Sequence, residues 1–142
     1  MKKFFIKNNK WQNISVIVEN EHGKWGLIFI THWLWDDKNS SHIIQYTKPF
    51  LTNDFVVVRF DTTNTFWESN GNFEDATLTN YYEDLKDVIE WASYQYFYKE
   101  KFILLWHSLW AISSALYSQE YSYKILSLIL ISSPINYELS AS

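Results

Sequence analysis

The chain has 142 residues, of which 47% are hydrophobic and 20% are charged. This balance is typical of one folded globular domain and excludes an intrinsically disordered chain. The net charge of −4 argues against nucleic-acid binding, and the lack of cysteine excludes a disulfide scaffold and cysteine metal sites. No apolar run reaches the ~18 residues of a membrane helix, and the basic start is followed by too few apolar residues for a signal peptide. We therefore expect a cytoplasmic protein without a membrane span.

The first part of the chain predicts a β-hairpin and then a buried strand. Residues 3–7 and 13–19 have the composition of strands, and the asparagine-rich connector between them favours a hairpin. A second turn at residues 20–24 precedes the apolar run 25–31, which is typical of a strand buried on both faces. Ligand sites gather in loops at the carboxyl ends of such strands, so residues 32–37 are a candidate site.

Two helices and another buried strand are predicted next. Residues 39–52 predict a helix with a polar N-cap, and residues 54–60 predict the strand. Residues 79–97 show the clearest helical period, with a capping-box pattern from Asn80 to Glu83. Its expected apolar stripe is Tyr81, Leu85, Val88, Ile89, Ala92 and Tyr96, and its expected solvated face is Glu83, Asp84, Lys86, Asp87 and Glu90.

The last part of the chain predicts a strand, a helix and a final strand. An apolar run ends at residue 106, a helical period begins at Leu109, and residues 124–131 read as a strand. The helix is expected to bury Ile112, Ala115 and Leu116. Alternation of this kind implies an α/β fold: a mostly parallel sheet with an amino-terminal β-hairpin and helices on both faces. We predict a single domain over residues 1–142.

Four local motifs indicate a family. In chain order they are His32-Trp33-Leu34-Trp35, residues 61–69, residues 71–85, and Trp106-His107-Ser108-Leu109-Trp110. With glycine at each tryptophan they match H-G-x-G, D-x-T-N-x-F-G-E-S, G-x-x-E-D-A-T-x-T-x-Y-x-x-D-L and the nucleophile elbow G-H-S-L-G. The chain therefore resembles the amino-terminal part of an α/β-hydrolase and is similar to the lipase, esterase and serine-aminopeptidase-like members.

This resemblance implies a serine hydrolase of carboxylic esters, thioesters or small amides. Ser108 would be the nucleophile that forms an acyl-enzyme, and the backbone N–H groups of Leu34 and Leu109 would hold the oxyanion. The remaining motif positions are His32, Trp33, Trp35, Trp106, His107 and Trp110. We expect a small acyl substrate, no cofactor and no metal site, since His32 and His42 make a poor metal pair.

The general base of such an enzyme is missing from these residues. The family's triad runs Ser, then Asp or Glu, then His, but no histidine follows Ser108, and the only later acids are Glu120 and Glu138. We therefore expect an incomplete domain, equivalent to strands 1 to 6 and truncated before the Asp and His loops, that is inactive by itself. Neither the acyl-chain preference nor the oligomeric state can be read from the sequence.

The tryptophans depart systematically from the family pattern. The chain has 8 Trp and 3 Gly, where average usage predicts about 10 Gly. Trp at 33, 35, 67, 106 and 110 falls on family glycines, and Trp11 occupies a turn position where glycine is usual. The codon TGA specifies tryptophan in some genetic codes and glycine in others. We hypothesise that the cell makes glycine at these positions. The alternative is a Trp-rich, non-catalytic α/β-hydrolase-like binding domain with an aromatic-filled pocket.

Overall fold

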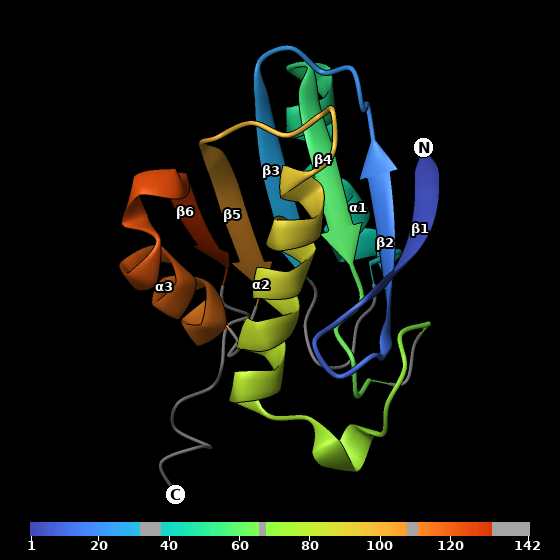
Figure 1. Cartoon of the computed structure of the whole chain (residues 1–142). Coiled ribbons are helices and arrows are strands. Elements are labelled where there is room, and N and C mark those ends of the chain that lie inside the picture. The colour runs from blue at the N-terminus through green and yellow to red at the C-terminus, as the bar shows by residue number, and fades with distance from the viewer. Residues whose placement is uncertain (32–37, 66–67, 108–110, 132–142) are drawn as a thin grey trace, which may run out of the picture.

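A computed structural model of the chain describes residues 1–31, 38–65, 68–107 and 111–131. Within these ranges, six strands form one sheet, and helices connect its parallel strands (Figure 1). The strands are β1 (Lys2–Lys7), β2 (Asn13–Glu19), β3 (Gly26–Thr31), β4 (Phe55–Phe60), β5 (Phe102–His107) and β6 (Ile125–Ile131). The helices are α1 (Ser41–Thr52), α2 (Leu78–Ser93) and α3 (Ala111–Glu120), with short 3₁₀ turns η1 (Phe73–Asp75) and η2 (Ser122–Lys124).

The sheet is mixed, with strand order β1-β2-β4-β3-β5-β6. The hairpin β1–β2 is antiparallel, and β2 pairs antiparallel with β4. The pairs β3–β4, β3–β5 and β5–β6 are parallel. Parallel neighbours need a crossover connection, and α1, α2 and α3 supply the three crossovers. The predicted α/β fold with an amino-terminal hairpin and a mostly parallel sheet is confirmed.

Helices cover both faces of the sheet, as expected from the apolar strands. On β5, Phe102, Leu104 and Trp106 belong to the core cluster shared with α2, whereas Ile103 and Leu105 pack in a second cluster with Ile43 of α1. Because side chains alternate across a strand, a strand covered on both faces reads as a continuous apolar run. Helices α2 and α3 lie beside each other on one face, and α1 lies on the other (Figure 1).

Helix α2 differs from its prediction in three respects. Its N-cap is Thr77, whose hydroxyl accepts the Asn80 N–H at 3.0 Å, so the expected capping box from Asn80 to Glu83 is wrong. The helix ends at Ser93, and Tyr96 beyond it is 65% exposed instead of buried. Asp84 is only 2% exposed, because it lies one turn after Asn80 on the side of the helix that faces the sheet and the loop after β4.

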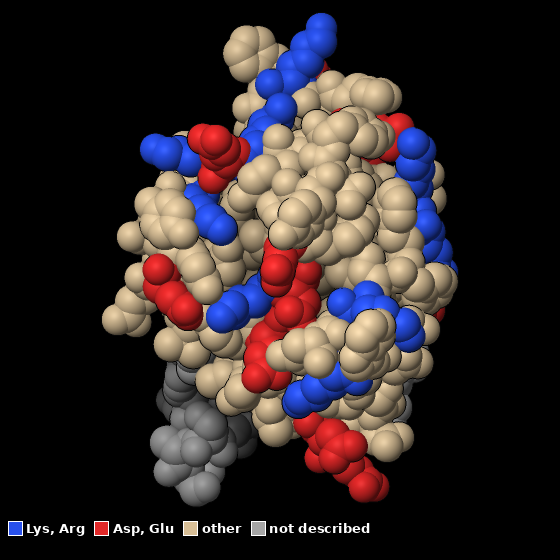
Figure 2. All heavy atoms as spheres, in the orientation of Figure 1, with Lys and Arg blue, Asp and Glu red and all other residues tan. Residues whose placement is uncertain are grey.

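Helix α3 also packs through a different face than expected. Ala115 and Leu116 are exposed, and Ser113, Ser114 and Tyr117 are buried instead. Small serine side chains allow α3 to approach α2 closely; the Ser113 hydroxyl lies 3.5 Å from the carbonyl oxygen of Leu78. The outer side of α2 carries the expected charges, and Figure 2 shows acidic side chains along this face.

None of the helices in the described ranges combines the length and the apolar character that crossing a membrane requires.

Candidate active site

The strands that precede the two candidate site segments are neighbours in the sheet. Strands β3 and β5 are parallel neighbours, and Thr31 at the end of β3 lies opposite Trp106 near the end of β5. Residues 32–37 and 108–110 therefore leave the sheet from adjacent carboxyl ends, where ligand sites of such sheets are found. The site candidates His32, Trp33, Leu34, Trp35, Ser108, Leu109 and Trp110 themselves lie outside the described residues.

Ser108 follows directly after a strand and shortly before a helix. Strand β5 ends at His107 and α3 begins at Ala111, so three residues connect them. This order agrees with the predicted strand-to-helix position of Ser108. The segment containing the predicted oxyanion donor Leu34 likewise separates β3 from α1.

Trp106 is the motif tryptophan that the structure describes. Its side chain is 1% exposed and lies in the core cluster on the α2 side of the sheet. The ring Nε1 has no hydrogen-bond partner in the described part of the chain. A buried polar group without a partner costs about 1–3 kcal/mol. The described part of the fold thus accommodates the volume of the indole in its core.

The other described tryptophans fall into different environments. Trp11 is 79% exposed and has a φ angle of 60°, in the left-handed region where glycine is preferred. Trp91 packs against Phe4 and Phe97, with ring centroids 5.2 and 6.0 Å away. Trp25 is 78% exposed. The hairpin turn therefore has the backbone conformation that the expected glycine would adopt, while position 91 suits tryptophan.

A buried ion pair lies beside the candidate site. Lys38 directly follows residues 32–37 and is 1% exposed, and Asp61 directly follows β4 and is fully buried. The Lys38 Nζ lies 2.5 Å from Asp61 Oδ2, and the Lys38 backbone N–H donates to Asp61 Oδ1 at 2.8 Å. Glu68 Oε1 lies 3.4 Å from the same ammonium group. A buried pair of this kind is strongly destabilising to break, because one charge is then left without a partner.

Arg59 completes this charged cluster from within β4. Its Nη1 donates to the carbonyl oxygen of Lys38 and, at 2.9 Å, to Oδ1 of Asn39. Its Nη2 lies 3.3 Å from Glu19 on the neighbouring strand β2. Neither Lys38 nor Arg59 was predicted from the sequence to be a site residue. A single arginine inside the apolar run of β4 was the available signal, since a buried charge requires a partner.

The loop after β4 is closed around Asn64. Asn64 has a φ angle of 61°, and its Nδ2 donates to the Asp75 carbonyl oxygen at 3.2 Å and to Asn80 Oδ1. Gly71 has a φ angle of 105°, and a Cβ there would lie 1.9 Å from Asn64 Oδ1. Glycine is thus required at position 71 for this loop to close.

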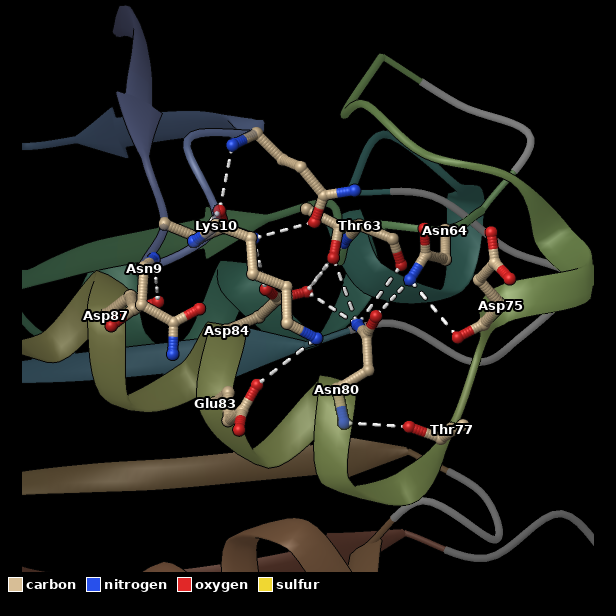
Figure 3. Close-up of polar contacts among 12 residues, drawn as sticks. Asn9, Lys10, Thr63, Asn64, Asp75, Thr77, Asn80, Glu83, Asp84 and Asp87 are labelled. Atoms are coloured by element: carbon tan, nitrogen blue, oxygen red, sulfur yellow. Dashed lines mark hydrogen bonds and ion pairs between the residues drawn. The ribbon is translucent and has the colours of Figure 1, made fainter.

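Asp84 joins three elements beside this loop (Figure 3). Its Oδ2 accepts the N–H and the hydroxyl of Thr63, both at 2.7 Å, and the amide of Asn80 at 3.0 Å. Its Oδ1 lies 3.4 Å from the amide nitrogen of Asn8 in the hairpin turn. Burial raises the pKa of Asp84 to about 6 despite these hydrogen bonds. The carboxyl therefore ties the hairpin and the loop to α2.

Metal chemistry has no candidate ligand set here: in the ranges that the structure describes, no three His, Cys, Asp or Glu residues lie together.

Comparison with known proteins gives structural matches. A scan against protein-family models finds no match, and a search of curated proteins finds none. The chain is similar to Est1E from Butyrivibrio proteoclasticus with bound ferulic acid, at 20% identity and a TM-score of 0.79, over 88% of this chain and 50% of that chain. It is similar to an α/β serine hydrolase homologue from Coxiella burnetii, at 24% identity and a TM-score of 0.76, over 99% and 67% of the respective chains.

A third similar structure is an esterase from Exiguobacterium antarcticum, with 16% identity and a TM-score of 0.73, over 91% of this chain and 44% of that chain. The chain thus spans about half the length of such structures. The sheet order, the crossover helices and these matches agree with the family resemblance of the motifs. The chain has the α/β-hydrolase fold.

Proposed function

We propose that this chain carries the nucleophile and the oxyanion donors of a serine hydrolase that acts on carboxylic esters, thioesters or small amides. The observation that carries the proposal is the parallel pairing of β3 with β5, with Thr31 opposite Trp106. The strands that precede Leu34 and Ser108 therefore end side by side, which supports a site formed by both segments. Acyl transfer requires a nucleophile and oxyanion donors close together.

The reaction would begin with attack of the Ser108 hydroxyl oxygen on the acyl carbon. A base accepts the hydroxyl proton, and the backbone N–H groups of Leu34 and Leu109 hold the developing oxyanion. The alcohol, thiol or amine then leaves with a proton, and water releases the acyl group from Ser108. All four histidines precede Ser108 in the sequence, unlike the Ser, Asp or Glu, His order of this fold. We infer that the base lies outside these 142 residues and that the chain alone does not turn over.

The structural matches support a small acyl substrate. One of them binds ferulic acid, a carboxylic acid, and another is an esterase. Because one fold hosts several chemistries, the experiment has to test the nucleophile directly.

The first test is the coding DNA together with covalent labelling. We expect TGA at codons 33, 35, 67, 106 and 110 and TGG at codon 91. The whole reading frame, expressed with glycine at the TGA positions, should react with a fluorophosphonate probe, and mass spectrometry should locate the adduct on Ser108.

Two serine variants make the labelling specific. Ser108→Ala should abolish it, whereas Ser93→Ala, which changes an exposed serine at the end of α2, should leave it intact. The 142-residue chain with its tryptophans should not be labelled. Labelling that persists in Ser108→Ala would contradict the proposed nucleophile.

A non-catalytic binding domain is the second candidate. It is favoured by the burial of Trp106, because the core accepts an indole at this position of β5. If all eight tryptophan codons are TGG and the protein from the whole reading frame is not labelled by the probe, the binding domain is the function that remains.

A further inference from the structure

We propose that a groove between α2 and α3 binds a free α-amino acid with an apolar side chain. The groove has a volume of about 400 Å³ and lies between the second half of α2, the end of α3 and the turn η2. Its lining includes Asp87, Ile89, Glu90, Tyr117, Tyr121 and Lys124. Lys124 directly precedes β6, whereas residues 108–110 follow the carboxyl end of β5. The groove is therefore a second site, and the inference does not depend on the proposed function.

The bottom of the groove is apolar and aromatic. Ile89 and Tyr117 line the groove although each is only 2% exposed, which places them at its bottom. The ring of Tyr121 lies against that of Tyr117, with ring centroids 4.6 Å apart and an angle of 30° between the ring planes. The apolar side chain of a ligand would leave water by contacting this surface.

The two sides of the groove carry charges of opposite sign. Asp87 and Glu90 are three residues apart on α2 and therefore lie on the same side of the helix, whereas Lys124 belongs to η2. Figure 2 shows acidic side chains over α2 and basic side chains next to them toward α3. Within the described ranges, neither Glu90 nor Lys124 forms an ion pair with another side chain. Both charges are thus available to a ligand.

Aromatic rings hold the Lys124 ammonium group in place. Its Nζ lies 5.3 Å from the centre of the Tyr121 ring and 5.8 Å from that of Tyr123. The Lys86 Nζ lies 5.6 Å from the Tyr121 ring, but it also lies 3.8 Å from Glu120, so an acid already compensates its charge. Attraction to a ring face orients an ammonium group without neutralising it. Lys124 is therefore the cation that can receive the carboxylate of a ligand.

The acidic side of the groove favours a bound ammonium group. Burial raises the pKa of Asp87, although its carboxylate accepts the Asn9 N–H at 2.9 Å. The negative charges of Glu90 and Glu83 raise this pKa further, and a positive ligand group would relieve the repulsion. A purely anionic ligand would meet the two acids, and a purely cationic ligand would meet Lys124. A ligand with both charges matches both sides, as an α-amino acid does.

Isothermal titration calorimetry with three matched ligands tests the charge requirement. The protein is the product of the whole reading frame, studied at neutral pH and low ionic strength. L-phenylalanine carries both charges, phenethylamine lacks the carboxylate, and 3-phenylpropanoate lacks the ammonium group. All three ligands share the ring and the two carbons next to it. We expect L-phenylalanine to bind at least about tenfold more tightly than either of the others.

Two neutral variants assign each ligand charge to its partner. Lys124→Gln removes the partner of the carboxylate, so L-phenylalanine should then bind no more tightly than phenethylamine. Glu90→Gln removes one partner of the ammonium group, so the preference over 3-phenylpropanoate should shrink at least about threefold. Lys48→Gln on α1 and Glu74→Gln in η1 make the same charge changes outside the groove and should bind like the parent. Thermal melts check that each variant is folded, and if one of the two groove variants is not, the other decides.

Three results would overturn the inference. They are no saturable binding of L-phenylalanine at millimolar concentration, binding that the groove variants leave unchanged, and equal or tighter binding of phenethylamine or 3-phenylpropanoate. The last result would identify a cation site or an anion site instead. Probe labelling of Ser108 is a separate measurement, so failure of the proposed function leaves this binding test intact, and the reverse also holds.

Discussion

Replacing Asp84 by asparagine should make the stability of this fold less dependent on pH. Asp84 is buried between α2, the hairpin turn and the loop after β4, and burial raises its pKa from the ordinary 3.8 to about 6. A carboxyl whose pKa is raised by folding favours the folded state when it is protonated. The contribution of Asp84 to the free energy of unfolding is therefore fully present below about pH 4 and is lost as the pH rises through about 6.

The size of the effect follows from the two pKa values. The difference between 3.8 and about 6 corresponds to about 3 kcal/mol between the fully protonated and the fully ionised carboxyl. Between pH 5 and pH 8, where the folded-state carboxyl of Asp84 goes from mostly protonated to mostly ionised, the change is about 1 kcal/mol. Asparagine keeps an oxygen for Thr63 and Asn80 but cannot ionise, and it gives up only the long contact to Asn8.

Urea unfolding followed by tryptophan fluorescence at pH 5 and pH 8 measures this change. The difference in unfolding free energy between Asp84→Asn and the parent should shift in favour of the variant by about 1 kcal/mol from pH 5 to pH 8. Other groups titrate in both proteins and cancel in the difference. Glu83→Gln, which alters the neighbouring carboxylate on the exposed side of α2, should follow the parent at both pH values. A gap that is equal at pH 5 and pH 8 would refute the assigned pKa and its cause.

Three further substitutions test other features. Trp11→Gly should raise the unfolding free energy by about 1 kcal/mol, because an exposed residue with φ of 60° is strained unless it is glycine; an unchanged or lower urea midpoint would contradict this. Gly71→Ala should lower the melting temperature, since its Cβ would overlap Asn64, and a melt equal to the parent's would show that the loop closes differently. Leu126→Lys should reduce aggregation in light scattering, because β6 is an edge strand with Leu126 61% exposed; equal aggregation would mean that this edge is not the cause.

The elements of the fold could be predicted because their signals are local. Continuous apolar runs at 25–31 and 54–60 indicated strands covered on both faces, and the hairpin and three crossover helices follow the predicted order. Trp11 was predicted at a turn position where glycine is usual, and its φ angle of 60° agrees with that prediction. The strand order β1-β2-β4-β3-β5-β6 was not predicted, because alternation indicates parallel strands but not which of them are neighbours.

The polar interior could not be predicted because its partners are far apart in the sequence. The charge of Asp84 predicted a solvent-exposed helix residue. In the structure it is buried, and hydrogen bonds from Thr63 and Asn8 compensate the cost of its burial. Lys38 and Asp61 meet across 23 residues, and Arg59 reaches the same main chain from within β4. Composition and periodicity determined which segments form strands and helices. Only the packing of those segments decided which charges are buried, since a charge enters the interior only where other elements supply its partners.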